Sequence, residues 1–210
     1  MKSLLLKDIY NIKHNMKQMI LILLFISICM FFNASVCGVV VFCSVLCTMM
    51  TVTTFAMDER CSFAKYAMIM PISRKSYVLE KYMACLIFTL TGTTVGFVES
   101  VVYGLFTHNL DLTLILICTG VGILFGLLCG IFYIPILFRF GSEQARLIIF
   151  GVFAFFGLVG FLIYWILNIL CIPITIPLLT VSLFFTPVLL ALFAVVSYFL
   201  SLKFFQAKEF

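Results

Sequence analysis

The sequence has very little charge. Only 10% of its 210 residues are Asp, Glu, Lys or Arg, whereas 65% are hydrophobic. A soluble domain carries roughly 25% charged residues and about 45–50% apolar residues. A soluble globule of this size could not bury so much apolar surface. The composition therefore indicates a membrane protein.

Several chemical signatures are also missing. The sequence has no G-x-x-x-x-G-K-[ST] loop, so we expect no ATP site of the usual kind and no cofactor in this chain. His14 and His108 are the only histidines and lie far apart, and no CxxC pair occurs among nine cysteines, so no metal site is expected. We expect the cysteines to pack as small hydrophobic residues. An intramembrane enzyme is disfavoured, because the Ser and Thr residues that could act as nucleophiles have no catalytic base beside them and the sequence has no set of metal ligands.

Long uncharged runs occupy most of the chain. Residues 18–57, 112–138 and 147–202 contain no Asp, Glu, Lys, Arg or His. Because one span needs about 20 apolar residues, these runs predict five spans, and a further span carries Glu99. We therefore predict an all-α polytopic membrane protein, with residues 1–210 as one transmembrane domain. The six predicted spans are 18–36, 39–57, 74–107, 112–138, 147–169 and 187–205.

The basic residues predict the orientation of these spans. All 13 Lys and Arg residues fall on one side of the six-span arrangement. Basic residues mark the cytoplasmic side of a membrane protein, so both termini are predicted to be cytoplasmic. The net charge of +5 follows from this topology and gives no reason to expect a nucleic-acid partner. Glu99 is expected near the opposite surface, where an interfacial carboxylate is favoured over a proton relay.

Residues 1–17 are expected to form an amphipathic helix at the membrane interface. Apolar residues at helical spacing predict a face toward membrane lipid. Such a helix either anchors the chain by its positive charge or also braces the cytoplasmic side of the bundle. The residues of the apolar face are Leu5, Ile9, Ile12 and Met16.

Residues 171–185 are apolar but too short to cross the membrane. Thr186-Pro187 is a favourable helix start, with Thr as N-cap and Pro in the first helical position. Non-helical backbone at membrane depth requires cover by protein or water. We therefore predict that residues 171–185 form a re-entrant or interfacial element at the outer face.

Residues 58–73 are the main polar segment. Asp58 and Glu59 are expected at the start of a short cytoplasmic helix, where the dipole favours negative charge. Pro71 should end that helix, and Ser73 suits an N-cap of the next. We predict that this segment couples the bundle to a cytoplasmic partner; the alternative is a solvated connection. The candidate coupling residues are Asp58, Glu59, Arg60, Phe63, Lys65, Tyr66, Met70, Pro71, Ser73 and Arg74.

Two features of the fourth span and its following connection are distinctive. Gly122, Gly126 and Gly130 lie four residues apart and share one helical face. Small residues at this spacing let helices approach closely, although the same face could line a substrate path. Residues 139–146 are expected to form a compact charged loop with a turn at Gly141.

Several motifs carry a family resemblance. Asp58-Glu59, the run 70–75 (M-P-I-S-R-K) and Lys81-Tyr82, with Tyr66 between them, resemble the signature of bacterial ABC exporter permeases of the drug- and peptide-export class. Met70 replaces the usual Leu. The resemblance spans the chain, because further segments are similar to the family's opening, second cytoplasmic loop and ending. These segments are Leu6-Lys7-Asp8, 139–146, 197–201 and 208–210.

The resemblance implies a permease subunit, not itself an enzyme, in the bacterial cytoplasmic membrane. It implies that ATP and Mg bind to a separate ABC ATP-binding subunit, and that two permease chains, as a homodimer or a heterodimer, pair with two such subunits. The size and short outer loops are most similar to permeases that export amphipathic peptides, such as phenol-soluble modulins or bacteriocins. The alternative is an ATP-independent small carrier or membrane assembly factor. An ATPase gene next to the gene for this chain would favour the ATP-driven permease over the ATP-independent alternative.

Overall fold

The fold was derived from a computed structural model. It describes residues 7, 8, 10, 20–23, 25, 36–61, 63, 66, 73–106, 111–169 and 176–207, with some side chains in these ranges not placed. The described part of the chain is helical and contains no strand. Four of its helices are long and apolar enough to cross a membrane: Gly38–Arg60, Arg74–Phe106, Leu112–Ala145 and Thr186–Gln206. These confirm the all-helical, multi-span class, whereas six spans and the orientation of the termini stay predictions.

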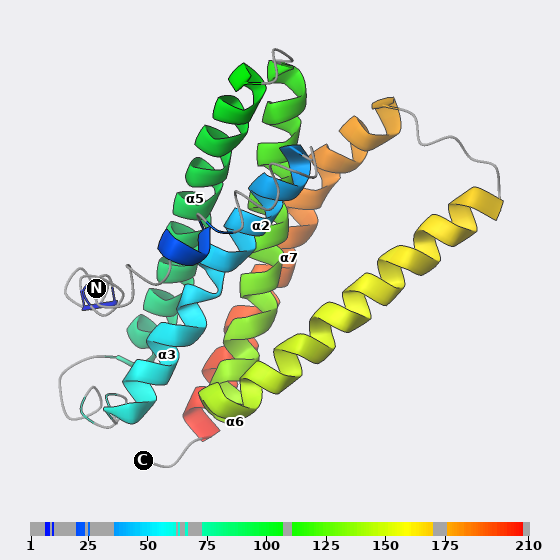
Figure 1. The fold of residues 1–210 in the computed structure, drawn as a ribbon. Helices are drawn as coiled ribbons and strands as arrows, with labels where there is room; N and C mark the ends of the chain where they lie inside the picture. Colours follow the sequence, from blue (N-terminus) through cyan, green and yellow to red (C-terminus); the bar gives the residue numbers. More distant parts are fainter. Residues whose placement is uncertain are drawn as a thin grey trace.

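The second predicted span consists of two consecutive helices. Helix α2 covers Val36–Thr48 and α3 covers Met50–Arg60. They meet at Met49, whose backbone is itself close to helical (φ −61°, ψ −17°). In Figure 1 they run as one bent rod beside α5, which covers Arg74–Phe106. The first predicted span, 18–36, lies mostly outside the described residues.

Helix α2 packs very closely against α5. A Cβ atom on Gly92 would lie 2.7 Å from the carbonyl oxygen of Cys43, and one on Gly96 would lie 2.8 Å from the Cα atom of Val40. Only glycine allows two backbones this near, as is common between membrane helices. The hydroxyl groups of Thr48 and Thr89 lie 3.1 Å apart across the same interface. α2 and α5 therefore form a tightly fixed pair.

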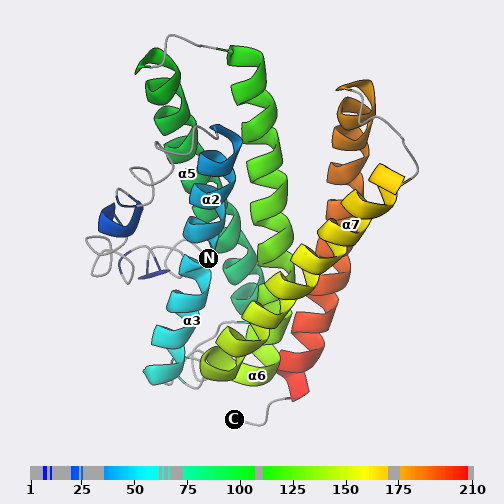
Figure 2. The ribbon, with the colours of Figure 1, turned by 45° about the vertical axis from the view of Figure 1, so that its right-hand side comes forward.

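Helix α6 covers Leu112–Ile169 and changes direction at Gly141, which has φ 80° and ψ 172°. The turn at Gly141 matches the sequence prediction, but the rest of 139–146 is helical and not a loop. One glycine suffices because it accepts a backbone conformation that other residues avoid. Figures 1 and 2 show residues 142–169 leaving the bundle at an angle to the first half of α6. Within the part of the chain that the structure describes, Cβ atoms on Gly151 and Gly157 would meet nothing within 4 Å.

Helix α7 covers Ile176–Ala207 and contains Pro187 in its interior. The predicted helix start at Thr186-Pro187 is therefore wrong, and residues 176–185 of the predicted outer element belong to the same helix as the sixth span. Membrane helices tolerate proline because neighbouring groups satisfy the freed carbonyl. Residues 171–175 lie outside the described ranges, and the position of this element at the outer face stays a prediction.

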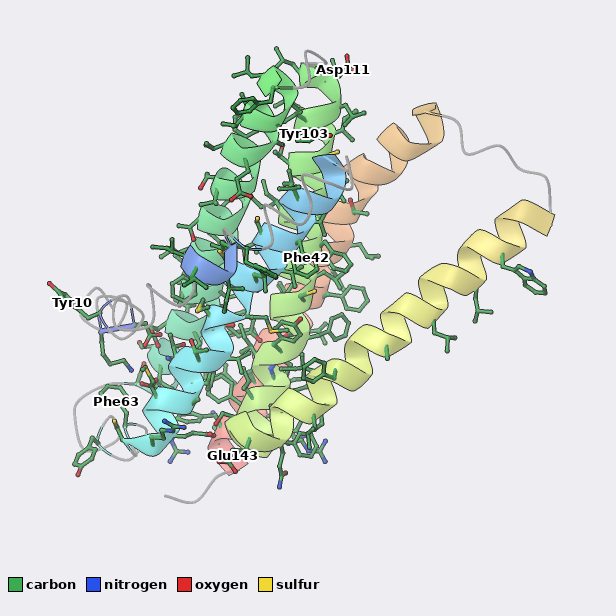
Figure 3. The ribbon with its side chains drawn as sticks, viewed as in Figure 1. Tyr10, Phe42, Phe63, Tyr103, Asp111 and Glu143 are labelled. Carbon is green, nitrogen blue, oxygen red and sulfur yellow. The ribbon has the colours of Figure 1, made fainter. Side chains whose placement is uncertain are left out.

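The largest apolar core lies where α3 ends, α5 begins, α6 bends and α7 ends, and we call this end of the molecule the charged end. Phe138 is at its centre, with ring centroids 4.9 Å from Phe55 and 5.4 Å from Phe205. Figure 3 shows Phe63 and Glu143 at this end and Tyr103 and Asp111 at the other. The described basic residues gather at the charged end, as the one-sided prediction requires.

One expectation about cysteine was wrong. Cys118 is disulfide-bonded, although the cysteines were expected to serve only as packing residues. The expectation fits the thiols of Cys43, Cys47, Cys85 and Cys129, which are free and buried. The thiol of Cys43 also lies 3.4 Å from Oε2 of Glu99, so Glu99 is half-buried against α2.

Candidate coupling site at the charged end

A buried ionic cluster joins three segments at the charged end. The ammonium group of Lys81, on α5, lies 2.8 Å from Oδ2 of Asp8 and 2.8 Å from Oδ2 of Asp58. Lys7 Nζ lies 2.6 Å from Oδ1 of Asp58. Together with Glu80, whose Oε2 is 3.8 Å from Lys81 Nζ, these residues are called the ion cluster below. The N-terminal segment, α3 and α5 therefore meet through paired charges.

The ion cluster is almost completely removed from water. Lys81 and Asp8 have no exposed side-chain surface, and Asp58 retains only 5%. Burying charges is costly unless they are paired and hydrogen-bonded, and here each of these three side chains has an opposite charge within 2.8 Å. Removing one partner would leave the others buried and unpaired, which is the costly change in such a site.

Aromatic rings form the walls of the ion cluster. Lys7 Nζ lies 3.6 Å from the ring centroid of Phe63, and Lys81 Nζ lies 5.1 Å from that of Phe55. A cation above an aromatic face is attracted by the ring quadrupole. The hydroxyl group of Tyr77 donates a hydrogen bond of 3.2 Å to Oδ2 of Asp58. The rings exclude water and also hold the charges in position.

The cluster contains two ammonium groups and three carboxyl groups. Burial alone would raise the pKa of Asp8, but attraction to Lys81, hydrogen bonds to the Glu80 carboxyl group and to Lys81, and a smaller attraction to Lys7 lower that pKa below its usual value. Asp8 is therefore held in its charged form.

Asp58 and Glu59 occupy a different position from the predicted one. Both lie in the last turn of α3, not at the start of a new helix. Negative charge is disfavoured at a helix C-terminus, but each carboxylate has a compensating partner. Asp58 binds the two lysines, and Glu59 Oε2 accepts a hydrogen bond of 2.8 Å from the backbone N–H of Ser142, and another from the hydroxyl group of Ser142.

The contact of Glu59 places its carboxylate at the N-terminus of a second helical segment. Ser142 directly follows Gly141, where the helix of residues 142–169 begins. A carboxylate that accepts hydrogen bonds from the first N–H groups of a helix is favoured by the dipole. The unfavourable position of Glu59 on α3 is thus offset by a favourable one on α6.

The remaining coupling candidates differ in their surroundings. Arg60 and Arg74 are exposed, and Tyr66 is 60% exposed. Ser73 accepts a hydrogen bond of 3.2 Å from the backbone N–H of Ser76, which confirms it as the N-cap of α5. Phe63 packs against the core and Lys7. The predictions for Lys65, Met70 and Pro71 lie outside the described residues.

The three glycines of α6 face α2 and α5. A Cβ atom on Gly122 would lie 3.0 Å from the side chain of Val40. Cβ atoms on Gly126 and Gly130 would overlap the side chains of Ser44 and Cys85, respectively. The hydroxyl group of Ser44 donates a hydrogen bond of 2.7 Å to the carbonyl oxygen of Gly122. At this face α6 is in direct contact with its neighbours.

Sequence reasoning missed most of the ion cluster. Lys7 and Lys81 entered among the basic residues that set the topology and, with Asp8, as parts of family-like motifs, whereas Tyr77 and Glu80 were given no role. A signal existed: Glu80 and Lys81 lie inside a predicted span, where ionisable residues are rare and are paired when they occur. The partners of Lys81 lie 73 and 23 residues away in the sequence, so no local pattern identifies them.

Comparison with known proteins supplies the family. Searches among curated proteins and among solved structures found no match. The model of the family described as ABC-2 family transporter protein matches residues 3–206, nearly the whole chain. That range contains every member of the ion cluster and the contact between Glu59 and Ser142. The chain therefore belongs to the ABC-2 transporter family and is a membrane permease of an ABC transporter.

Proposed function

We propose that this chain is the permease subunit of an ATP-driven exporter in the bacterial cytoplasmic membrane. The observation that carries the proposal is the ion cluster, found in a chain of the ABC-2 family. It ties the N-terminal segment, the end of the second span and the start of the third into one unit at the charged end. A force applied there would reach several spans together, as a bundle driven by a separate motor requires.

The partner in this proposal is an ABC ATP-binding subunit. Family membership implies such an association, and we propose two copies that bind and hydrolyse ATP with Mg. The chain itself then has no enzymatic activity. The exposed ring of Tyr66, together with exposed Arg60, offers an aromatic and a cationic anchor. Aromatic and Arg side chains often dominate interface energies.

The proposed substrate is an amphipathic peptide or another lipophilic compound. The described middle of the bundle contains few ionisable groups, and its buried hydroxyl groups are used internally: Thr51 Oγ1, for example, donates to the carbonyl oxygen of Thr48. A strongly hydrophilic substrate would lose hydration without finding partners. The six predicted spans are few to enclose a path for a peptide, so we propose two permease chains, as a homodimer, with the path between them.

Reconstitution with the ATP-binding subunit tests this function. The two proteins are placed in vesicles, and ATP hydrolysis is measured with an amphipathic helical peptide and, separately, with a small sugar. We expect stimulation by the peptide and none by the sugar. Stimulation by the sugar alone would contradict the substrate class. A chain that binds no ATP-binding subunit would contradict the proposed function.

A further inference from the structure

Two adjacent carboxylates at the end of α3 bind to three different parts of the chain. Asp58 contacts Lys7 of the N-terminal segment and Lys81 of α5. Glu59 contacts Ser142, at the bend of α6. Since neighbouring residues in a helix point in directions about 100° apart, one dipeptide can reach both sides of the α3 end. The end of α3 is therefore a junction between the N-terminal segment, α5 and α6.

The bend of α6 is built to receive the Glu59 carboxylate. At Gly141, with φ 80°, a Cβ atom would lie 3.0 Å from Oε1 of Glu59. Any other residue would crowd the carboxylate in addition to straining the backbone. Glycine thus allows both the change of direction and the close approach of Glu59 to the N–H group of Ser142.

Few of the side chains that the structure describes support the helix beyond Ser142. Ala145 and Ile149 are buried in the core, but Leu147 and Phe150 are 77% and 73% exposed. Further on, no described atom lies within 4 Å of the Cβ position of Gly157. Among the described residues, the buried contacts of residues 142–169 lie in their first two turns, where Glu59 is the only described side chain that hydrogen-bonds to Ser142.

We propose that Glu59 is a positioning residue that sets the direction of residues 142–169 by capping their helix from α3. Displacement of the coupling segment that follows α3 then moves this helix together with α5. The inference rests on the proposed function for its role in export, but the geometric part does not need the ATP-binding subunit. Position 158 lies about 24 Å along the helix from Ser142, at 1.5 Å per residue, so a change of about 10° moves it by about 4 Å.

A pulsed electron-spin distance measurement tests the geometric part. Genetically encoded spin-label residues replace Met83 on α5 and Leu158 on α6, which are 43% and 59% exposed, in the full chain in lipid nanodiscs. We expect Glu59→Ala to shift or broaden the distance distribution by about 4 Å. Glu59→Gln keeps an acceptor oxygen and should therefore show a distance distribution close to that of the wild type. Glu143→Ala, an exposed carboxylate two residues after Gly141, is the matched control and should change nothing.

A second variant approaches the same contact from α6. Ser142→Pro removes both donors to Glu59, and proline is tolerated at the first position of a helix. We expect the same shift as with Glu59→Ala and no further shift in the double variant. An unchanged distribution in both single variants would overturn the proposal, as would an equal shift in Glu143→Ala.

The role in export is tested with the ATP-binding subunit present. We expect Glu59→Ala to lower the amount of peptide exported per ATP hydrolysed by at least threefold without changing binding of the subunit, with Glu59→Gln close to wild type. An unchanged export ratio alongside a shifted distance would overturn the role in export. Failure of the wild-type chain to bind any ATP-binding subunit would instead refute the proposed function and leave the distance result standing.

Discussion

Replacement of Lys81 by methionine should destabilise the protein more than any other single loss of charge at the charged end. The ammonium group has no exposed surface and makes contacts of 2.8 Å to Asp8 and to Asp58. Methionine has a similar length, so the change leaves little cavity. It leaves three carboxyl groups facing only Lys7. Removing one partner of a buried ion pair costs about 3–5 kcal/mol, and we expect a loss in that range.

The assay is reversible unfolding in mixed detergent micelles, followed by circular dichroism. Lys75→Met is the matched control, because Lys75 is on the same helix but exposed; it should change the free energy of unfolding by less than about 0.5 kcal/mol. Adding Asp8→Asn to Lys81→Met removes the carboxylate that loses its partner at 2.8 Å and should recover part of the loss. Coupled residues deviate from additivity by about 0.5–3 kcal/mol. A Lys81→Met protein as stable as Lys75→Met would refute the reasoning.

Three further predictions follow from the same geometry. Gly141→Ala should destabilise the bend by about 1–3 kcal/mol, because alanine avoids this backbone conformation; unfolding in micelles measures it, and an unchanged stability contradicts it. Gly96→Val should disrupt the α2–α5 contact and lower the unfolding temperature. Gly157→Val should not, because no described atom lies within 4 Å of the Cβ position of Gly157. Equal losses of unfolding temperature in the two variants would exclude close packing as the cause. Because the pKa of Asp8 is lowered in the folded protein, the ionised Asp8 should contribute fully to stability above its unfolded pKa of about 3.9, and this contribution should decline as the pH falls. The measurement is the free energy of unfolding over a pH series, with and without Asp8→Asn. Identical pH profiles for the two proteins would contradict the prediction.

The membrane class followed from the sequence because it depends on composition and on runs of uncharged residues, which need no tertiary information. The turn at Gly141 and the N-cap at Ser73 followed because both depend on local backbone chemistry. The helix that continues through Pro187 did not, because the rule that proline begins or ends a helix is weaker in a membrane.

The ion cluster could not be found from local patterns. The distance in sequence from Asp8 to Lys81 is 73 residues, and the pairing depends on how the N-terminal segment meets α5. The position of Asp58 and Glu59 was predicted wrongly for a related reason. A dipole argument places them at the start of a helix, but their charges are compensated by Lys7, Lys81 and Ser142 from distant parts of the chain. Tertiary partners reversed the local preference.

The central claim is that an ATP-binding subunit docks at the charged end, and its most direct test is the mass of the purified complex. The wild-type chain is purified from the membrane together with the candidate subunit and measured by native mass spectrometry, beside Tyr66→Ala and Leu105→Ala. Both side chains are exposed, at 60% and 59%, but Leu105 lies at the opposite end of α5. We predict a complex of two permease chains and two ATP-binding subunits for the wild type and for Leu105→Ala, and loss of the ATP-binding subunits from Tyr66→Ala. Loss of the ATP-binding subunits from Leu105→Ala, together with their retention by Tyr66→Ala, would contradict docking at the charged end.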